Sequence, residues 1–166
     1  MPLKIGIDVG GVLSIHKTDV GDGEHENTGI DMPHAIESVR ALAAAGHTLY
    51  IVSFCGRRRA METRDSLVAC GLADCFAAMY FVKKVTHKKH VCASLGLDVL
   101  IDDRGDILRS VTCGTHRVKF GDRPVDCDPC YHCADWTAVN ALVPTLAAAP
   151  LEATGASLES YLNKLD

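Results

Sequence analysis

The chain has 166 residues, of which 48% are hydrophobic and 23% charged, a composition that is ordinary for a globular domain. Its formal net charge of −4 weakens the case for nucleic acid as a partner, although local basic clusters occur at 57–59 and 83–89. No stretch approaches the roughly 20 apolar residues that a membrane span needs, and we identify no signal peptide. We therefore expect a cytoplasmic domain without a membrane partner.

The hydrophobic pattern predicts strands that alternate with helices. Strands are expected at 3–7, 49–52, 79–82, 99–101 and 117–120. Helices are expected from about 33 to 45, with Asp31 or Met32 as the cap, and at 57–70, 88–95, 107–111 and 136–146; loops are expected at 14–30 and 121–133. This alternation predicts an α/β fold over residues 1–150, a three-layer sandwich around a central, mostly parallel sheet.

Residues 151–166 form a short tail beyond this domain. Four apolar residues recur in it at helical spacing, namely Leu158, Tyr161, Leu162 and Leu165. We expect this stripe to pack on the body of the protein or on a partner chain.

The end of the first predicted strand carries the most informative sequence. Asp8 follows an apolar run directly, and Gly10 and Gly11 come next. Ligands of open parallel sheets bind at the carboxyl ends of the strands, and paired glycines allow a turn that points N–H groups at an anion. Within the strand, Gly6 allows a neighbouring element to approach closely. Taken alone, the segment fits a turn with a solvated carboxylate equally well.

Polar residues also end two later strands. Ser53 follows the second strand, and Asp102 and Asp103 end the fourth, so all should meet Asp8 at one edge of the sheet. Lys88 opens a helix and could reach the same crevice. Several carboxylates suit a hard divalent cation such as Mg²⁺, while a hydroxyl and an ammonium suit phosphate oxygens. An aspartate can also attack phosphorus directly.

Four stretches in this order resemble the haloacid-dehalogenase-like (HAD) superfamily: IGIDVGGVL, LYIVSFCG, KKHVCASLG and VLIDDRGDIL. The resemblance covers most of residues 3–146. Within this superfamily, the chain is similar to an uncharacterised subgroup whose first motif is DxGGV and whose last motif is DDR. No insertion is long enough to build a cap domain, so the resemblance implies a capless fold with an open site.

The resemblance implies a Mg²⁺-dependent phosphohydrolase. Asp8 would be the nucleophile that becomes an aspartyl phosphate. Mg²⁺ would be held by Asp8, the backbone carbonyl of Gly10 and Asp103, with Asp102 as a further candidate ligand.

Other matched positions would bind the substrate. Ser53 and Lys88 would hold the phosphoryl group, assisted by the N–H groups near Val9, Gly10 and Gly11. Asp106 matches the second acidic position of the last motif and would orient Lys88 or a metal-bound water.

One position departs from the pattern of the superfamily. Most of its phosphatases carry a second Asp two residues after the nucleophile, which protonates the leaving oxygen, and this chain has Gly10 there. Loss of one positioned proton-transfer group costs on the order of 10²–10⁴-fold. The loop at 14–30 offers substitutes, namely His16, Asp19, Asp22 and His25. We therefore expect weak catalysis or, as the alternative, a non-catalytic module that binds phosphate or metal.

An open site would admit a phosphorylated small molecule or the phosphorylated end of a macromolecule. Arg104, and the arginines at 57–59 beginning with Arg57, could contact such a substrate; each could equally be a solvated cation at a helix start. Dehalogenases and phosphonate hydrolases of the superfamily also lack the second Asp, but they use residues from a cap, so we rank both lower.

A second candidate site lies in the cysteine-rich segment near the C-terminus. Cys127, Cys130 and Cys133, with Cys113 and His116 upstream, hold enough soft ligands for a structural Zn²⁺. The spacing fits known zinc patterns loosely, and a loop with reduced thiols is the competing interpretation. A zinc-stabilised interaction protein is therefore a third hypothesis.

Overall fold

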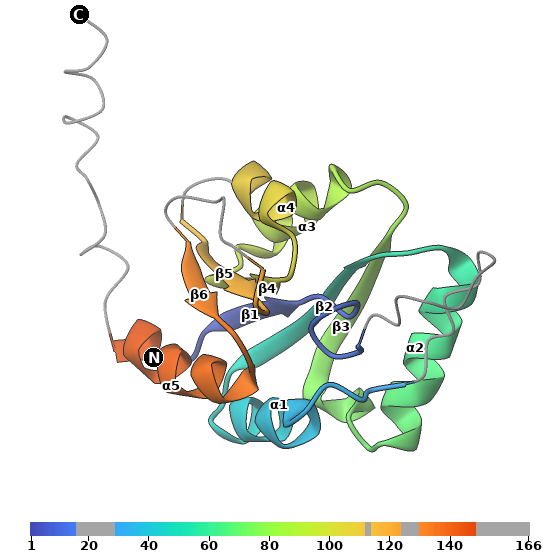
Figure 1. Ribbon diagram of the computed structural model, residues 1–166, viewed down its shortest axis with the longest axis horizontal. Helices are drawn as coiled ribbons and strands as arrows, with labels where there is room; N and C mark the ends of the chain where they lie inside the picture. The colour runs from blue at the N-terminus through green and yellow to red at the C-terminus, as the bar shows by residue number, and fades with distance from the viewer. Residues whose placement is uncertain (16–28, 112–113, 124–129, 149–166) are drawn as a thin grey trace, which may run out of the picture.

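The computed structural model describes residues 1–15, 29–111, 114–123 and 130–148 (Figure 1). Six strands form one sheet in the order β3-β2-β1-β4-β5-β6, and every neighbouring pair is parallel. The strands are β1 (Lys4–Ile7), β2 (Thr48–Phe54), β3 (Phe76–Val82), β4 (Val99–Asp102), β5 (His116–Phe120) and β6 (Tyr131–Cys133). The predicted α/β class with a parallel central sheet is confirmed.

Helices cover both faces of the sheet. The helices α1 (Ala35–Ala44), α2 (Arg57–Ala69) and α5 (Trp136–Ala148) lie on one side, and α3 (His87–Leu95) and α4 (Gly105–Ser110) on the other (Figure 1). A single 3₁₀ turn, η1 (Ala73–Cys75), precedes β3. The three-layer arrangement predicted from the alternating pattern is therefore present.

The central strand β1 separates two apolar clusters. Ile5 and Ile7, both fully buried, belong to the cluster under α1 and α5, while Leu97 and Leu100 belong to the cluster under α3 and α4. Gly6 faces this second cluster, and a Cβ added to it would lie 2.5 Å from Leu97 Cδ1. The close approach expected at Gly6 is confirmed.

Three local predictions were wrong. The segment 121–133, expected to be all loop, ends in strand β6, because Tyr131 and Cys133 pair with β5. Strand β3 begins at Phe76 instead of 79. Neither Asp31 nor Met32 caps α1: the N-cap is His34, in the left-handed region at φ 63°, and the carboxylate of Asp31 accepts a hydrogen bond from the backbone N–H of Ile15.

Two further predictions concern segments that the structure leaves undescribed. The apolar stripe of the tail lies outside the described residues, so its packing stays a prediction. The connection at 16–28 also lies outside them, so the absence of a cap stays a prediction too. None of the helices within the described residues is long and apolar enough to cross a membrane.

Candidate active site

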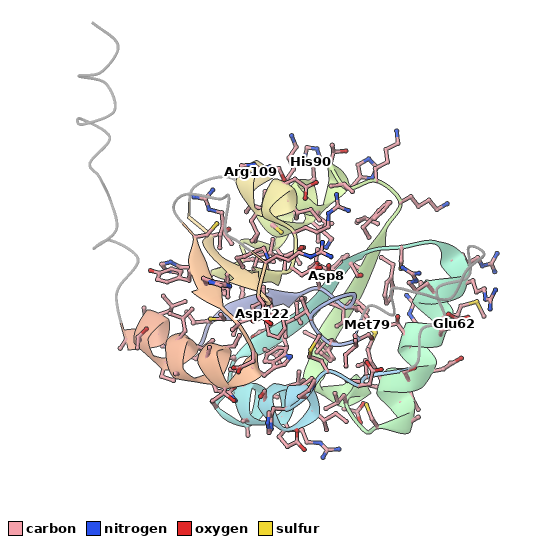
Figure 2. The ribbon with its side chains drawn as sticks, viewed as in Figure 1. Asp8, Glu62, Met79, His90, Arg109 and Asp122 are labelled. Carbon is pink, nitrogen blue, oxygen red and sulfur yellow. The ribbon has the colours of Figure 1, made fainter. Side chains whose placement is uncertain are left out.

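The register of the sheet brings Asp8 beside Asp102. Ile7 pairs with Ile101, and the backbone N–H of Asp8 donates to the carbonyl of Ile101 at 3.0 Å. Both carboxylates therefore leave neighbouring strands at the same level, and Figure 2 shows Asp8 at the centre of this edge of the sheet. Both residues are buried, at 6% and 0% exposure. The convergence of strand ends expected from the sequence is present.

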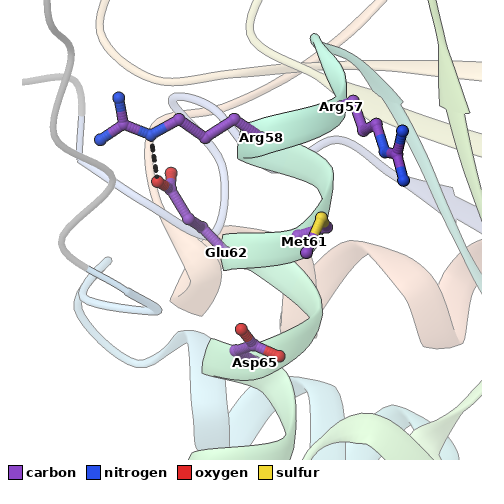
Figure 3. A pocket seen from close by; sticks show the side chains of 5 residues that line it. All are labelled: Arg57, Arg58, Met61, Glu62 and Asp65. Atoms are coloured by element: carbon purple, nitrogen blue, oxygen red, sulfur yellow. Dashed lines mark hydrogen bonds and ion pairs between the residues drawn. The ribbon is translucent and has the colours of Figure 1, made fainter.

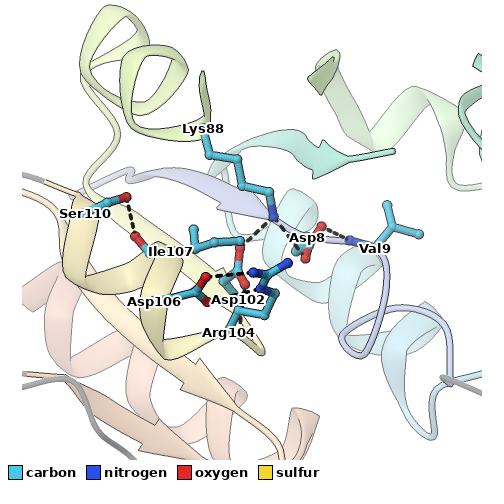
Figure 4. A network of polar contacts seen from close by, with 8 residues as sticks. All are labelled: Asp8, Val9, Lys88, Asp102, Arg104, Asp106, Ile107 and Ser110. Atoms are coloured by element: carbon cyan, nitrogen blue, oxygen red, sulfur yellow. Dashed lines mark hydrogen bonds and ion pairs between the residues drawn. The ribbon is translucent and has the colours of Figure 1, made fainter. Parts of the chain in front are cut away.

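Lys88 joins the two carboxylates. Its Nζ lies 3.0 Å from Asp8 Oδ2 and 2.7 Å from Asp102 Oδ2 (Figure 4). Helix α3 delivers this side chain from above the sheet, and the lysine has no exposed surface. Burial disfavours its charged form, but the two carboxylates outweigh that effect and raise its pKa. Lys88 is thus a fixed positive charge beside the candidate nucleophile.

The carboxylates form a cluster suited to a divalent cation. One oxygen each from Asp8, Asp102 and Asp103 lies within 4.8 Å of the others. Three carboxylates against one ammonium leave an excess of negative charge. Burial and the charge of Asp8 raise the pKa of Asp102 to about 7, against the opposing effect of Lys88. Hard oxygen ligands with excess negative charge match the donor set of Mg²⁺.

The glycine turn after Asp8 is folded more tightly than the sequence indicated. Of the three amides expected to face a phosphate, Val9 donates to the Asp8 carboxylate at 2.8 Å and Gly11 donates to the carbonyl of Ser14 at 2.8 Å. Those two amides are therefore already used, which corrects the expectation for them. Gly11 has φ 74°, a left-handed conformation that favours glycine. Gly10 is left as the candidate amide for a ligand.

Ser53 lies where the motif predicts it. It is the second-last residue of β2, one position beyond the level of Asp8, and it is 4% exposed. Its hydroxyl forms no hydrogen bond with another described residue, so it can donate to a ligand.

Asp106 does not contact Lys88. Its carboxylate pairs instead with Arg104, with Nη2 to Oδ2 at 2.6 Å and Nε to Oδ1 at 3.1 Å (Figure 4). Asp106 therefore does not orient Lys88, which Asp102 contacts instead, and its expected role toward a metal-bound water stays a prediction. The backbone N–H of Arg104 in turn donates to Asp102 Oδ1 at 2.9 Å.

Arg57 lies on the outer face of α2. It lines a surface pocket together with Arg58, Met61, Glu62 and Asp65 (Figure 3). Burial raises the pKa of the Cys55 thiol, and the charges of Arg59, Asp8 and Lys88 also act on that pKa. Arg59 is the one arginine of 57–59 with this effect. Arg57 forms no hydrogen bond or ion pair with the carboxylate cluster within the described residues, and its substrate contact stays a prediction.

One buried cation, Lys119, was not predicted from the sequence. Lys119 lies on β5, where its register partner is Asp102 of β4, and it is 3% exposed. Its Nζ donates a hydrogen bond to the carbonyl of Phe120 at 3.0 Å. A lysine between two apolar strand residues resembles any alternating strand, so the sequence held no signal for it.

The zinc hypothesis is not supported. Cys113 and Cys127 lie outside the described residues. Cys130 is disulfide-bonded and so offers no thiolate, which also corrects the competing interpretation of a loop with reduced thiols at this position. Burial raises the pKa of Cys133 to about 11. The ring of His116 packs edge-on against the ring of Tyr131, with 5.7 Å between the ring centroids. Within the described residues, the aspartate cluster is the one group placed to hold a metal ion.

No protein-family model and no curated protein matches the chain. Solved structures do match its fold. One is an uncharacterised protein from Listeria monocytogenes serotype 4b, with a TM-score of 0.66, 14% identity and coverage of 89% of this chain and 99% of that one. A second is a D,D-heptose 1,7-bisphosphate phosphatase from B. bronchiseptica, complexed with magnesium and phosphate, with a TM-score of 0.59, 17% identity and coverage of 90% and 100%.

A third structure is a HAD-superfamily hydrolase from Ehrlichia chaffeensis, with a TM-score of 0.59, 11% identity and coverage of 89% of this chain and 99% of that one. The chain has the HAD-like fold. The chain also matches two longer solved structures and covers 55% of the length of each. At these identities the likeness establishes the HAD-like fold alone.

Proposed function

We propose that the protein is a Mg²⁺-dependent phosphohydrolase that uses Asp8 as its nucleophile. The observation that carries this proposal is the buried contact of Lys88 with both Asp8 and Asp102, at 3.0 and 2.7 Å. A structural role alone would not call for such an arrangement, because burying three charges is costly when apolar residues could fill the same volume. Perturbed, buried ionisable groups at the carboxyl ends of strands are typical of active sites.

The chemistry would proceed in two displacements on phosphorus. An oxygen of Asp8 attacks the phosphoryl group, the bond to the leaving oxygen breaks, and the leaving group takes the electron pair. Water then attacks the aspartyl phosphate and releases its proton to solvent, and Asp8 recovers its carboxylate. Lys88, the hydroxyl of Ser53 and the amide of Gly10 would bind the phosphoryl oxygens and stabilise the charge that develops there.

Asp8, Asp102, Asp103 and the carbonyl of Gly10 would hold the Mg²⁺. Bound there, the ion would offset the charge of the carboxylates and of the phosphate, so that two anions could approach each other. The fit rests on the clustered oxygens and on the excess negative charge of the site.

The alternative function is a non-catalytic phosphate- or metal-binding module. The observation that favours it is Gly10, which places no proton donor two residues after Asp8. The substitutes proposed at His16, Asp19, Asp22 and His25 lie outside the described residues. A substrate whose leaving group needs no protonation separates the two hypotheses, because it requires the nucleophile but not the missing acid.

Hydrolysis of an activated aryl phosphate, with and without Mg²⁺, is the appropriate assay. We expect Mg²⁺-dependent turnover in the wild type, its loss in Asp8→Asn, and wild-type turnover in Asp74→Asn, which removes an exposed carboxylate of η1. Equally negligible rates in all three proteins would reject the hydrolase and favour the binding module.

A further inference from the structure

Arg104 and Asp106 form a doubly hydrogen-bonded pair beside the carboxylate cluster (Figure 4). The two bonds measure 3.1 and 2.6 Å, and the side chains are 45% and 48% exposed. Two parallel bonds fix the plane of the guanidinium, whereas a single bond would let it rotate. The pair thus presents an oriented cation to solvent.

Asp106 uses only one edge of this guanidinium. It accepts from Nε and Nη2, which leaves both protons of Nη1 and the second proton of Nη2. Within the described part of the chain, the Nη1–Nη2 edge has no hydrogen-bond acceptor. That edge has the fork geometry that binds a phosphate or carboxylate through two parallel bonds.

The guanidinium lies within electrostatic reach of the candidate active site. The hydrogen bond that Arg104 donates to Asp106 is the largest cause of its raised pKa, and the charges of Asp102 and Asp103 contribute as well. The backbone of Arg104 is tied to Asp102 by the 2.9 Å bond described above. The second edge of the guanidinium is therefore held next to the carboxylate cluster, where an anion bound to it would be a neighbour of that cluster (Figure 4).

The same pair is a poor source of protons. The hydrogen bond that Asp106 accepts from Arg104 lowers the pKa of Asp106, which is the wrong direction for a general acid at neutral pH. Gly10 offers no side chain in place of that acid. Beside the carboxylate cluster, Arg104 thus offers a positive charge, and Asp106 does not offer a proton. A positive charge assists a leaving group that departs as an anion.

We propose that Arg104 binds a second phosphate on the leaving side of the substrate, so that phosphoanhydrides are the preferred substrate class. This inference rests on the proposed phosphohydrolase function. Asp8 would attack the terminal phosphorus, and the bond from that phosphorus to the bridging oxygen would break. The leaving phosphate would keep the electron pair on that oxygen, paired with Arg104, and would need no proton from the protein.

The test compares kcat/KM for inorganic pyrophosphate and for an aryl phosphate, at fixed excess Mg²⁺. We expect Arg104→Ala to lose about 10-fold or more on pyrophosphate and less than about 3-fold on the aryl phosphate, the range expected for hydrogen bonds to a charged group. Arg104→Lys should recover only part of the loss, because lysine cannot bond through a fork. Arg40→Ala, which removes an exposed arginine of α1 that donates to the carbonyl of Cys70, should change neither substrate.

Equal losses on both substrates in Arg104→Ala would overturn the proposal, because they would indicate a merely structural role. If neither the wild type nor the variants hydrolyse either substrate, the proposed phosphohydrolase function is rejected. The role of Arg104 is then tested by ligand binding. Calorimetry would then compare methylenediphosphonate with methylphosphonate. An Arg104-dependent preference of about 10-fold for the diphosphonate supports the second phosphate site; equal affinities in wild type and Arg104→Ala overturn it.

Discussion

The ammonium of Lys88 lies 2.7 Å from a carboxylate oxygen of Asp102, and neither side chain has any exposed surface. Asp8 completes the contact at 3.0 Å from the same nitrogen. The lysine comes from a helix above the sheet, and the two carboxylates come from adjacent parallel strands. Stability and candidate chemistry therefore depend on the same three side chains.

We predict that Lys88→Met destabilises the protein by about 3–5 kcal/mol, because it leaves two buried carboxylates without their partner. Methionine keeps most of the volume, so the loss would reflect charge more than packing. Urea unfolding at neutral pH measures it. Lys83→Met, at an exposed position, should change the free energy of unfolding by less than about 0.5 kcal/mol.

The double variant Lys88→Met with Asp102→Asn checks the cause. Removing one of the stranded carboxylates should return part of the lost stability. A double variant whose loss equals the sum of the single losses would contradict the electrostatic explanation.

Gly10→Asp should increase turnover of alkyl phosphates, since it places a carboxyl two residues after the nucleophile. Gly10 is absent from the positive-φ residues of the described chain, so a side chain meets no backbone strain there. Positioned proton transfer contributes about 10²–10⁴-fold, and we expect the lower end of this range. Gly10→Asn, which has the same shape but no transferable proton, should show no gain, and an equal gain in both variants would refute the acid's role.

Gly6→Ala should destabilise the fold by about 1–3 kcal/mol, because the new methyl group meets Leu97 Cδ1 at 2.5 Å and must displace it. Thermal unfolding followed by circular dichroism measures the change. The matched control is Gly56→Ala, where no atom lies within 4 Å of the added Cβ, and its effect should be smaller. Equal effects at the two positions would show that the contact at Gly6 carries no cost.

Cys92 should make the protein less stable at alkaline pH. Burial raises the pKa of this thiol from 9.0 to about 11. The unfolded state therefore loses the proton first, so the contribution to stability is complete below pH 9 and is lost as the pH rises from about 9 to about 11. Denaturant unfolding across this range should give a shallower decline in Cys92→Ala, by up to about 1.4 kcal/mol per pH unit. Parallel declines in the two proteins would contradict this.

The sequence was sufficient for the sheet and for the meeting of Asp8, Lys88 and Asp102. Long apolar runs ending in polar residues carry that information, because carboxyl ends of parallel strands share one edge. It was insufficient for strand β6, whose three residues are too few to show a period and which exists through its pairing with β5.

The polar partners of the site were the hardest to predict. The motif indicated Asp106 as the acid that orients Lys88, and only the geometry shows that Lys88 bonds to Asp102 while Asp106 accepts from Arg104. Similarly, Gly11 and Val9 appeared equally able to bind an anion until the turn showed both amides already bonded. Choices among nearby side chains depend on directions that a linear pattern does not encode.

The central claim is that Asp8 becomes phosphorylated, and direct detection of that adduct tests it best. With Gly10 in place of the acid–base residue, breakdown of the aspartyl phosphate should be slow, so the adduct should accumulate. The protein would be mixed with an aryl phosphate and Mg²⁺, reduced with borohydride and digested for peptide mass spectrometry. Conversion of residue 8 to homoserine, absent in Asp8→Asn, is the predicted result. Turnover of the aryl phosphate in Asp8→Asn at the wild-type rate, with residue 8 of the wild type unmodified, would contradict it.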